Sequence, residues 1–367
     1  MVSGHAYPWD VLGDPDFADR AAAAVGTVTL AATYHSTRAA TPLHPSRRIV
    51  DARYAALYRT VRAAAWDGHL LRAAAPDWMD DKDPFGTAVS TLHDAGLAVQ
   101  AWIVLTHNTR LGLEHPEVSV VNCFGERYPY ALCPAHPAVR EYAATLAGEA
   151  VRDVAVDGVS LEACGQLGLV HLGHHEKTDG AWTAEQIRLL SVCCCTACRA
   201  GWQEAGLDPD RVVAGLRAGS PAADVQAAVL ANRHRNTDAL RTGVLDAVRS
   251  HAPGVPVTLH AQPDPWATGP SPGLTPAAAA SVDALLVPAW PTTEASAELV
   301  RRAAATGLPV DAYVTVLPPV DPDAVPGHLA RLRAAGASRI SLYHLGLAAR
   351  DRQELLTASA GSWLRPQ

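Results

Sequence analysis

The stretch LHDAGLAVQAWIVL, residues 92–105, decides how this chain is expected to fold. A helical pattern stops at Gly96, and a continuous apolar run follows at once. Glycine suits the left-handed residue that closes a helix, and an unbroken apolar run is typical of a parallel strand buried on both faces. The same junction recurs in AAATGLPVDAYVTVL (303–317) and RAAGASRISLYHL (333–345). The sequence therefore predicts helices that alternate with parallel strands.

Further apolar runs bring the predicted strands to eight: 27–34, 55–60, 98–105, 156–162, 256–261, 283–289, 308–315 and 339–344. The segment 55–60 fits a helix equally well. Eight strands alternating with helices favour an α/β protein of the (β/α)8 TIM-barrel type. A doubly wound sheet is the alternative, but the first predicted strand lacks a glycine-rich nucleotide loop. We expect one barrel domain over residues 1–367, with an elaborated loop after strand four that holds a cysteine-containing excursion at about 163–255.

Composition limits the class of protein. The 367 residues are 49% hydrophobic and 18% charged, which is enough for a large core. A net charge of −7 without any basic run argues against nucleic-acid binding. No apolar run is long enough for a membrane span or a signal peptide, and seven cysteines, four of them within CCCTAC (193–198), do not resemble a secreted disulfide framework. We expect a cytoplasmic protein without a nucleic-acid or membrane partner, and a homo-oligomer is compatible with so apolar a barrel.

Polar and aromatic residues stand where the predicted strands end. In a barrel the carboxyl ends of the strands face the mouth of the active site. Strand four ends at Glu162, and an ionised glutamate is costly to bury without partners or a function. The other strand ends supply ten candidate substrate-binding residues: Tyr34, His35, His107, Asn108, His260, Gln262, Trp290, Tyr313, Tyr343 and His344. Any of these ten can also be a packing residue, whereas Glu162 is interpreted as functional.

The segment ALCPAHPAVREYAATLAGEAVRDVAVDGVSLE (131–162) resembles the hypothetical, glycosidase-like TIM-barrel proteins. The shared elements are Pro134, His136-Pro137, Val139-Arg140, Tyr142, Asp157-Gly158 and the strand-end acid Glu162. The preceding stretch 83–104 is similar to the helix and third strand of that family, so the resemblance covers about 80 residues. It implies a glycosidase that acts on an oligosaccharide, a glycoside or another sugar-containing small molecule.

Glycoside cleavage ordinarily uses two carboxyl groups. Glu162 matches the strand-four acid/base of many barrel glycosidases, but VDAYVTVL (310–317) lacks the carboxylate that such enzymes often place at the end of strand seven. Asp264, just beyond strand five, is the candidate second carboxylate, and a turn aspartate between two prolines is its alternative interpretation. Trp266 and Trp290 are candidate platforms for a sugar ring. The other strand-end residues would bind hydroxyls or tune the acid.

The stretch LSVCCCTACRAGW (190–202) contains a C-x-C-x-x-C pattern of Cys193, Cys195 and Cys198. Three thiolates at this spacing can hold a structural zinc ion if a fourth ligand comes from elsewhere. Cys164, His174 and His175 lie nearby in the sequence. The alternative is that the cysteines are reduced, buried packing residues.

Two other classes of function remain open from the sequence. In the first, four strand-end histidines and Glu162 hold a catalytic divalent metal in a metal-dependent hydrolase or isomerase; they are His35, His107, His260 and His344. In the second, the barrel binds carbohydrate without catalysis, since strand seven lacks its acid. The glycosidase interpretation requires no cofactor for the chemistry itself.

Overall fold

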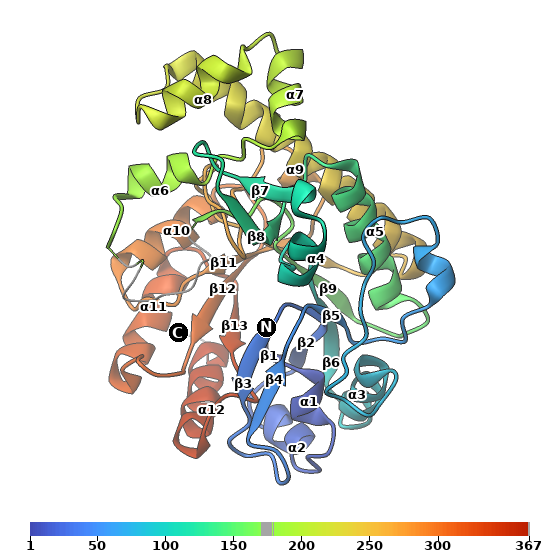
Figure 1. Cartoon of the computed structure of the whole chain (residues 1–367). Coiled ribbons are helices and arrows are strands. Elements are labelled where there is room, and N and C mark those ends of the chain that lie inside the picture. The colour runs from blue at the N-terminus through green and yellow to red at the C-terminus, as the bar shows by residue number, and fades with distance from the viewer. Residues whose placement is uncertain (170–177, 179, 366–367) are drawn as a thin grey trace.

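The computed structural model of the chain describes residues 1–169, 178 and 180–365 (Figure 1). Eight parallel strands close into a barrel because β1 pairs with both β2 and β13. In chain order these strands are β1 (Val2–Ala6), β2 (Thr27–Tyr34), β6 (Ala98–Val104), β9 (Gly158–Glu162), β10 (Val257–His260), β11 (Ala284–Pro288), β12 (Val310–Thr315) and β13 (Arg339–Tyr343). The predicted (β/α)8 fold is confirmed.

Helices surround the barrel and fill the connections between its strands (Figure 1). The helices are α1 (Pro8–Val11), α2 (Phe17–Ala22), α3 (Pro84–Asp94), α4 (Thr109–Glu114), α5 (Pro137–Val151), α6 (Ala184–Leu190), α7 (Thr196–Glu204), α8 (Pro209–Arg217), α9 (Ala223–His251), α10 (Glu294–Ala304), α11 (Val325–Ala334) and α12 (Arg350–Leu364). Short hairpins and 3-10 turns complete the loops: β3 (Thr37–Ala40) with β4 (Ile49–Ala52), β7 (Ser119–Val121) with β8 (Arg127–Leu132), and the turns Ala63–Trp66, Pro116–Val118, Ala278–Ala280 and Pro322–Ala324. No helix in the described part of the chain is long and apolar enough to cross a membrane.

The glycines that suggested the fold have the backbone conformation that their role requires. Gly96, Gly307 and Gly336 have φ angles of +77°, +81° and +107°. Each follows the end of a helix, α3, α10 or α11, and a barrel strand begins within three residues of it. A side chain disfavours this left-handed conformation, so glycine stops the helix and turns the chain toward the sheet.

One predicted strand is wrong and one barrel strand was missed. Within 55–60 only Ala56–Leu57, labelled β5, is extended, and it pairs antiparallel with the end of β2 outside the barrel. The missed strand is β1, whose sequence VSGHA contains a glycine and polar residues in place of an apolar run. The two errors compensate each other, so the barrel still has eight strands and Glu162 still ends the fourth of them.

The interior of the barrel is polar, which explains why the sequence of β1 lacks a continuous apolar run. Ser3 of β1 donates a hydrogen bond of 2.9 Å to Ser341 of β13, and Ser341 in turn contacts His5 at 3.2 Å. The outward faces of the strands pack on the helices through apolar side chains such as Val99 and Leu161. Inward-facing hydroxyl and imidazole groups therefore lead up to the mouth of the barrel.

The segment between β9 and β10 forms the predicted excursion. Its described part contains α6, α7, α8 and α9, and α9 packs along α5. Figure 1 shows α7 and α8 projecting beyond the end of the barrel. The connection after the fourth strand is therefore the elaborated one, as predicted.

Candidate active site

Glu162 is the last residue of β9 and is buried, with 5% of its surface exposed. Its Oε2 accepts a hydrogen bond of 2.8 Å from the indole Nε1 of Trp102 on the adjacent strand β6. The Nδ1 atom of His260 on β10 lies 3.7 Å from the same oxygen. Burial raises the pKa of Glu162 to about 7, against the opposing effect of the Trp102 hydrogen bond. A carboxyl group with this pKa can both donate and accept a proton near neutral pH.

Three tyrosines from different strands surround this carboxyl group. Tyr34 ends β2, Tyr313 lies on β12 and Tyr343 ends β13. Burial is the first cause that raises the pKa of each phenol, and the charge of Glu162 raises all three further. Their hydroxyl groups therefore remain protonated, and those of Tyr34 and Tyr343 hydrogen-bond to each other and to Tyr7.

Trp290 and two histidines extend the aromatic wall to the rim. The indole of Trp290 is 39% exposed, and its ring centre lies 4.8 Å from that of Tyr343. At another part of the rim the rings of His35 and His107 lie 4.0 Å apart, and His35 stacks on Tyr34 at 4.2 Å. Aromatic faces beside hydroxyl and imidazole groups suit a ligand with both apolar faces and hydroxyls.

His344 is a neutral hydrogen-bond donor. Its Nδ1 accepts hydrogen bonds from the backbone N–H groups of Gly346 and Leu347, at 3.2 and 3.3 Å. Burial lowers the pKa of His344 to about 3, so the ring is uncharged and its proton lies on Nε2. Within the described residues this Nε2 is buried without a hydrogen-bond partner.

Four of the predicted site residues do not join this group. Asn108 caps α4: its Oδ1 accepts from the N–H of Leu111, and its Nδ2 donates to the hydroxyl of Tyr142. The backbone of Gln262 forms a bridge with Gly273 in the loop after β10, and its side-chain oxygen is buried without a hydrogen-bond partner among the described residues. The remaining two, Asp264 and Trp266, line a separate groove with Arg188.

Asp264 has the contact expected of a turn residue. Its Oδ1 accepts a hydrogen bond of 3.0 Å from the backbone N–H of Trp266. The guanidinium of Arg188 lies over the indole of Trp266, 5.0 Å from the ring centre. In the described part of the chain no hydrogen bond or ion pair links Asp264 to Glu162.

A second buried carboxyl group, missed in the sequence, belongs to Asp10. It follows β1 in α1, it is 3% exposed, and its Oδ2 accepts a hydrogen bond of 2.8 Å from the N–H of Tyr7. Burial raises the pKa of Asp10 to about 8. The charges of both Glu162 and Asp10 raise the pKa of Tyr343. The available signal was the pattern HAYPWD, in which His5 and Tyr7 alternate before an acid, but β1 was not recognised as a strand.

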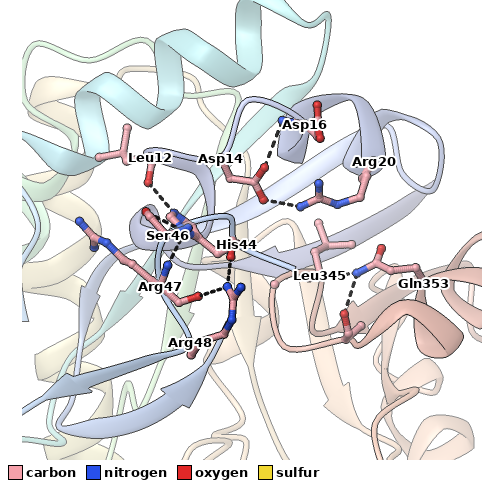
Figure 2. Close-up of polar contacts among 12 residues, drawn as sticks. Leu12, Asp14, Asp16, Arg20, His44, Ser46, Arg47, Arg48, Leu345 and Gln353 are labelled. Carbon is pink, nitrogen blue, oxygen red and sulfur yellow. Dashed lines mark hydrogen bonds and ion pairs between the residues drawn. The ribbon is translucent and has the colours of Figure 1, made fainter. Parts of the chain in front are cut away.

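Asp10 lines a pocket together with Asp14, His44 and Leu345. Polar contacts hold the loops that carry these three residues in place (Figure 2). Arg20 of α2 pairs with Asp14 at 2.5 Å, and His44 Nε2 contacts the carbonyl of Leu12 at 3.1 Å. On the other side, the amide of Gln353 in α12 donates to the carbonyl of Leu345 at 2.9 Å. These contacts fix the loops after strands one, two and eight, and with them Asp10 and His344.

Four cysteines meet in a separate cluster. The sulfur atoms of Cys133, Cys193, Cys195 and Cys198 all lie within 4.8 Å of one another and are buried. Cys133 Sγ lies 3.6 Å from Cys198 Sγ and 3.7 Å from Cys195 Sγ. A tetrahedral zinc ion with Zn–S bonds of about 2.3 Å requires sulfur separations of about 3.8 Å. The two separations from Cys133 are close to this value, so the four thiols could hold one metal ion between them.

The structure brings a fourth cysteine to the predicted three. Cys133, just after β8, completes the set with the predicted Cys193, Cys195 and Cys198, whereas Cys164 is not part of the cluster. The other two residues considered, His174 and His175, lie outside the described residues. Cys133 precedes the triplet by 60 residues, so only folding reveals their proximity.

The histidines of the mouth do not form a comparable metal site. Among the residues that the structure describes, the cysteine cluster is the one group of three or more His, Cys, Asp or Glu side chains whose ligand atoms converge. His35, His107, His260 and His344 do not gather with Glu162 in such a group. The geometry thus gives no support to the metal-dependent alternative.

Comparisons with known proteins agree on the fold. No protein-family model and no curated protein sequence matches this chain. Among solved structures, alpha-L-fucosidase isoenzyme 2 from Paenibacillus thiaminolyticus is similar with a TM-score of 0.62 and 16% identity, over 98% of this chain and 48% of that one. The PgaB (BpsB) glycoside hydrolase domain from Bordetella bronchiseptica has a TM-score of 0.60 and 18% identity over 98% of both chains. The catalytic domain of a beta-amylase from Paenibacillus polymyxa has a TM-score of 0.60 and 12% identity, over 100% of this chain and 99% of that one.

This chain therefore has the barrel fold that several glycoside hydrolases share, as the sequence resemblance implied. It spans about half the length of the fucosidase, 48%, but nearly the whole of the PgaB domain and of the beta-amylase domain. At these identities the likeness concerns the fold, and a proposal about activity has to be argued from the site.

Proposed function

We propose that the protein is a glycoside hydrolase with Glu162 as its general acid/base and a glycoside or oligosaccharide as its substrate. The observation that carries the proposal is the place of Glu162: a buried carboxyl group at the carboxyl end of a barrel strand, with a pKa of about 7. Active sites of this fold lie at that end. The similarity to glycosidase barrels supports the same assignment.

The surrounding residues have roles that fit a sugar. Trp290 would stack on the apolar face of a ring, while the hydroxyls of Tyr313 and Tyr343 and the Nε2–H of His344 would bind its hydroxyl groups. Glu162 would then protonate the glycosidic oxygen as the bond to the sugar breaks. Contacts between the sugar and the aromatic wall hold the glycosidic oxygen within reach of Glu162.

Two residues are candidates for the second catalytic carboxyl group, and an experiment can distinguish them. Asp10 is buried near Tyr343, and Asp264 is engaged in a turn beside Trp266. Because the second carboxyl group activates water or attacks the sugar, Asp10→Asn should lower kcat/KM at least about 100-fold if Asp10 has that role. Asp264→Asn should then change it less than about threefold, and the reverse pattern would move the role to Asp264. The hydrolysis rate of both variants on one substrate decides the assignment.

The pH dependence follows from the raised pKa of Glu162. A general acid works in its protonated form, which predominates below its pKa of about 7. The value of kcat/KM should therefore fall about tenfold per pH unit above pH 8, where Asp10, whose pKa burial raises to about 8, is ionised as well. An initial-rate profile between pH 5 and 9 measures it, and a rate that keeps rising to pH 9 would be incompatible with an acid role for Glu162.

The proposed function is tested by turnover of a broad panel of aryl glycosides and natural oligosaccharides, with and without a chelator. We expect hydrolysis of at least one linkage at a rate that the chelator does not change during the assay. Immediate and reversible loss with the chelator would favour a metal-dependent hydrolase. Binding of oligosaccharides without any turnover would favour the carbohydrate-binding barrel, and either result would overturn the proposal.

We also propose that Cys133, Cys193, Cys195 and Cys198 bind a structural zinc ion. Closed sites with four thiolates are structural because they leave no position for substrate. The ion would join the loop after β8 to the beginning of α7, and so fix the excursion to the barrel. It would take no part in the reaction at Glu162.

A further inference from the structure

Two imidazoles inside the barrel share one arrangement. His260 Nε2 lies 2.9 Å from the hydroxyl of Ser160, and His5 Nδ1 lies 3.2 Å from the hydroxyl of Ser341. In each ring the other nitrogen is buried and has no hydrogen-bond partner among the described residues. The two pairs differ in what that nitrogen faces: His260 Nδ1 lies 3.7 Å from Glu162 Oε2.

The surroundings of Glu162 decide which nitrogen of His260 carries the proton. The titratable groups that face Glu162 are His260 of β10 and three uncharged phenols, Tyr34 of β2, Tyr313 of β12 and Tyr343 of β13. Burial lowers the pKa of His260 to about 3, so the ring has a single proton. If that proton were on Nε2, the lone pair of Nδ1 would face the lone pairs of an ionised Glu162, which is unfavourable.

Ser160 offers the arrangement that avoids this repulsion. Its hydroxyl can donate to Nε2, which leaves the proton on Nδ1 and directed at Glu162. The same oxygen accepts a hydrogen bond of 2.8 Å from the indole N–H of Trp102. Both N–H groups are uncharged, and they come from β6 and β10, the strands on either side of β9.

We propose that Ser160 fixes His260 as the Nδ1–H tautomer, so that Nδ1–H faces Oε2 of Glu162 across 3.7 Å while the hydrogen bond from Trp102 holds that oxygen, and Oε1 is left as the oxygen that exchanges the proton. His260 is thus a positioning residue. The hydrogen bond from Trp102 and the electrostatic attraction of the Nδ1–H group that faces Oε2 both favour the carboxylate form, which offsets part of the effect of burial. The inference rests on the proposed role of Glu162 as acid/base, but its geometry is tested without turnover.

The first test is the tautomer of His260. Histidine labelled with ¹⁵N distinguishes Nδ1–H from Nε2–H, and the His260 signals are identified by their loss in His260→Gln. We expect Nδ1–H in the wild-type protein at pH 9, and mixed tautomers in Ser160→Ala. Ser341→Ala is the matched control, because it removes the same hydroxyl from the His5 pair and should leave the His260 signals unchanged. The Nε2–H tautomer at pH 9 in the wild-type protein would overturn the proposal.

The second test is the proton affinity of Glu162, followed by ¹³C spectra of its side-chain carboxyl group and identified with Glu162→Gln. The midpoint should rise by about half a pH unit in His260→Phe, since the N–H group that faces the carboxylate at 3.7 Å is lost. It should rise less in His260→Gln, which retains an amide N–H, and it should not move in Ser341→Ala. An unchanged midpoint in folded His260→Phe and His260→Gln would contradict the proposal.

The outcomes of these two spectroscopic tests do not depend on whether the proposed function is correct. If no glycoside is hydrolysed, the tautomer and the midpoint of Glu162 still confirm or reject the hydrogen-bond arrangement. If hydrolysis is found and the midpoint does not depend on His260, the glycosidase assignment stands while the positioning role falls.

Discussion

Glu162→Gln should lower kcat/KM by about 10²–10⁴-fold, the usual contribution of a positioned general acid/base. Glutamine has the same shape, but its amide cannot give a proton to a leaving group. Its carbonyl oxygen can still accept the hydrogen bond from Trp102, so the barrel should keep its structure. We expect a thermal midpoint within a few degrees of the wild-type value, measured by circular dichroism beside the hydrolysis rates.

A surface glutamate provides the control for this substitution. Glu298 lies on the outer helix α10 and pairs with Arg301. Because surface ion pairs contribute little, Glu298→Gln should change neither the hydrolysis rate nor the thermal midpoint appreciably. A folded Glu162→Gln protein with the full rate would remove Glu162 from the chemistry.

The second large effect is expected when a cysteine of the cluster is substituted. Protein purified without chelator should contain about one zinc ion per chain, and Cys133→Ser or Cys195→Ser should lose it because the site has no replacement ligand. Loss of a structural metal belongs to the few changes that destabilise a protein by more than about 4 kcal/mol. Elemental analysis and thermal unfolding measure the two effects together.

Two neighbouring cysteines serve as controls for the zinc assignment. Cys194 lies within the same triplet and Cys164 two residues after Glu162, yet neither belongs to the cluster. Cys194→Ser and Cys164→Ser should both retain the metal. Absence of zinc from the wild-type protein, or its retention in Cys133→Ser, would contradict the proposed site.

The sequence predicted those parts of the fold that depend on local patterns. Gly96, Gly307 and Gly336 each close a helix before an apolar strand, and the structure has all three junctions. The strand β1 was missed because its inward residues, Ser3 and His5, belong to a polar interior. A pattern of apolar residues cannot reveal a strand whose side chains bind one another through hydroxyl and imidazole groups.

The candidate site was predictable only where strand ends carry distinctive residues. Glu162 and Tyr313 became candidates through their positions on predicted strands, whereas Asp10 did not, because the strand β1 before it was missed. Cys133 lies 60 residues before its partners, and its role depends on the folding of the excursion onto the loop after β8. Contacts between segments far apart in the chain therefore account for most of what the sequence did not indicate.

The central claim, that Glu162 gives a proton to the leaving group, is tested most directly by a series of aryl glycosides whose phenols differ in acidity. A weakly acidic phenol needs the proton and a strongly acidic one leaves without it. The account predicts that Glu162→Gln slows the weakly acidic members by about 10²–10⁴-fold and the most acidic member far less. An equal loss across the whole series, or no loss, would contradict it.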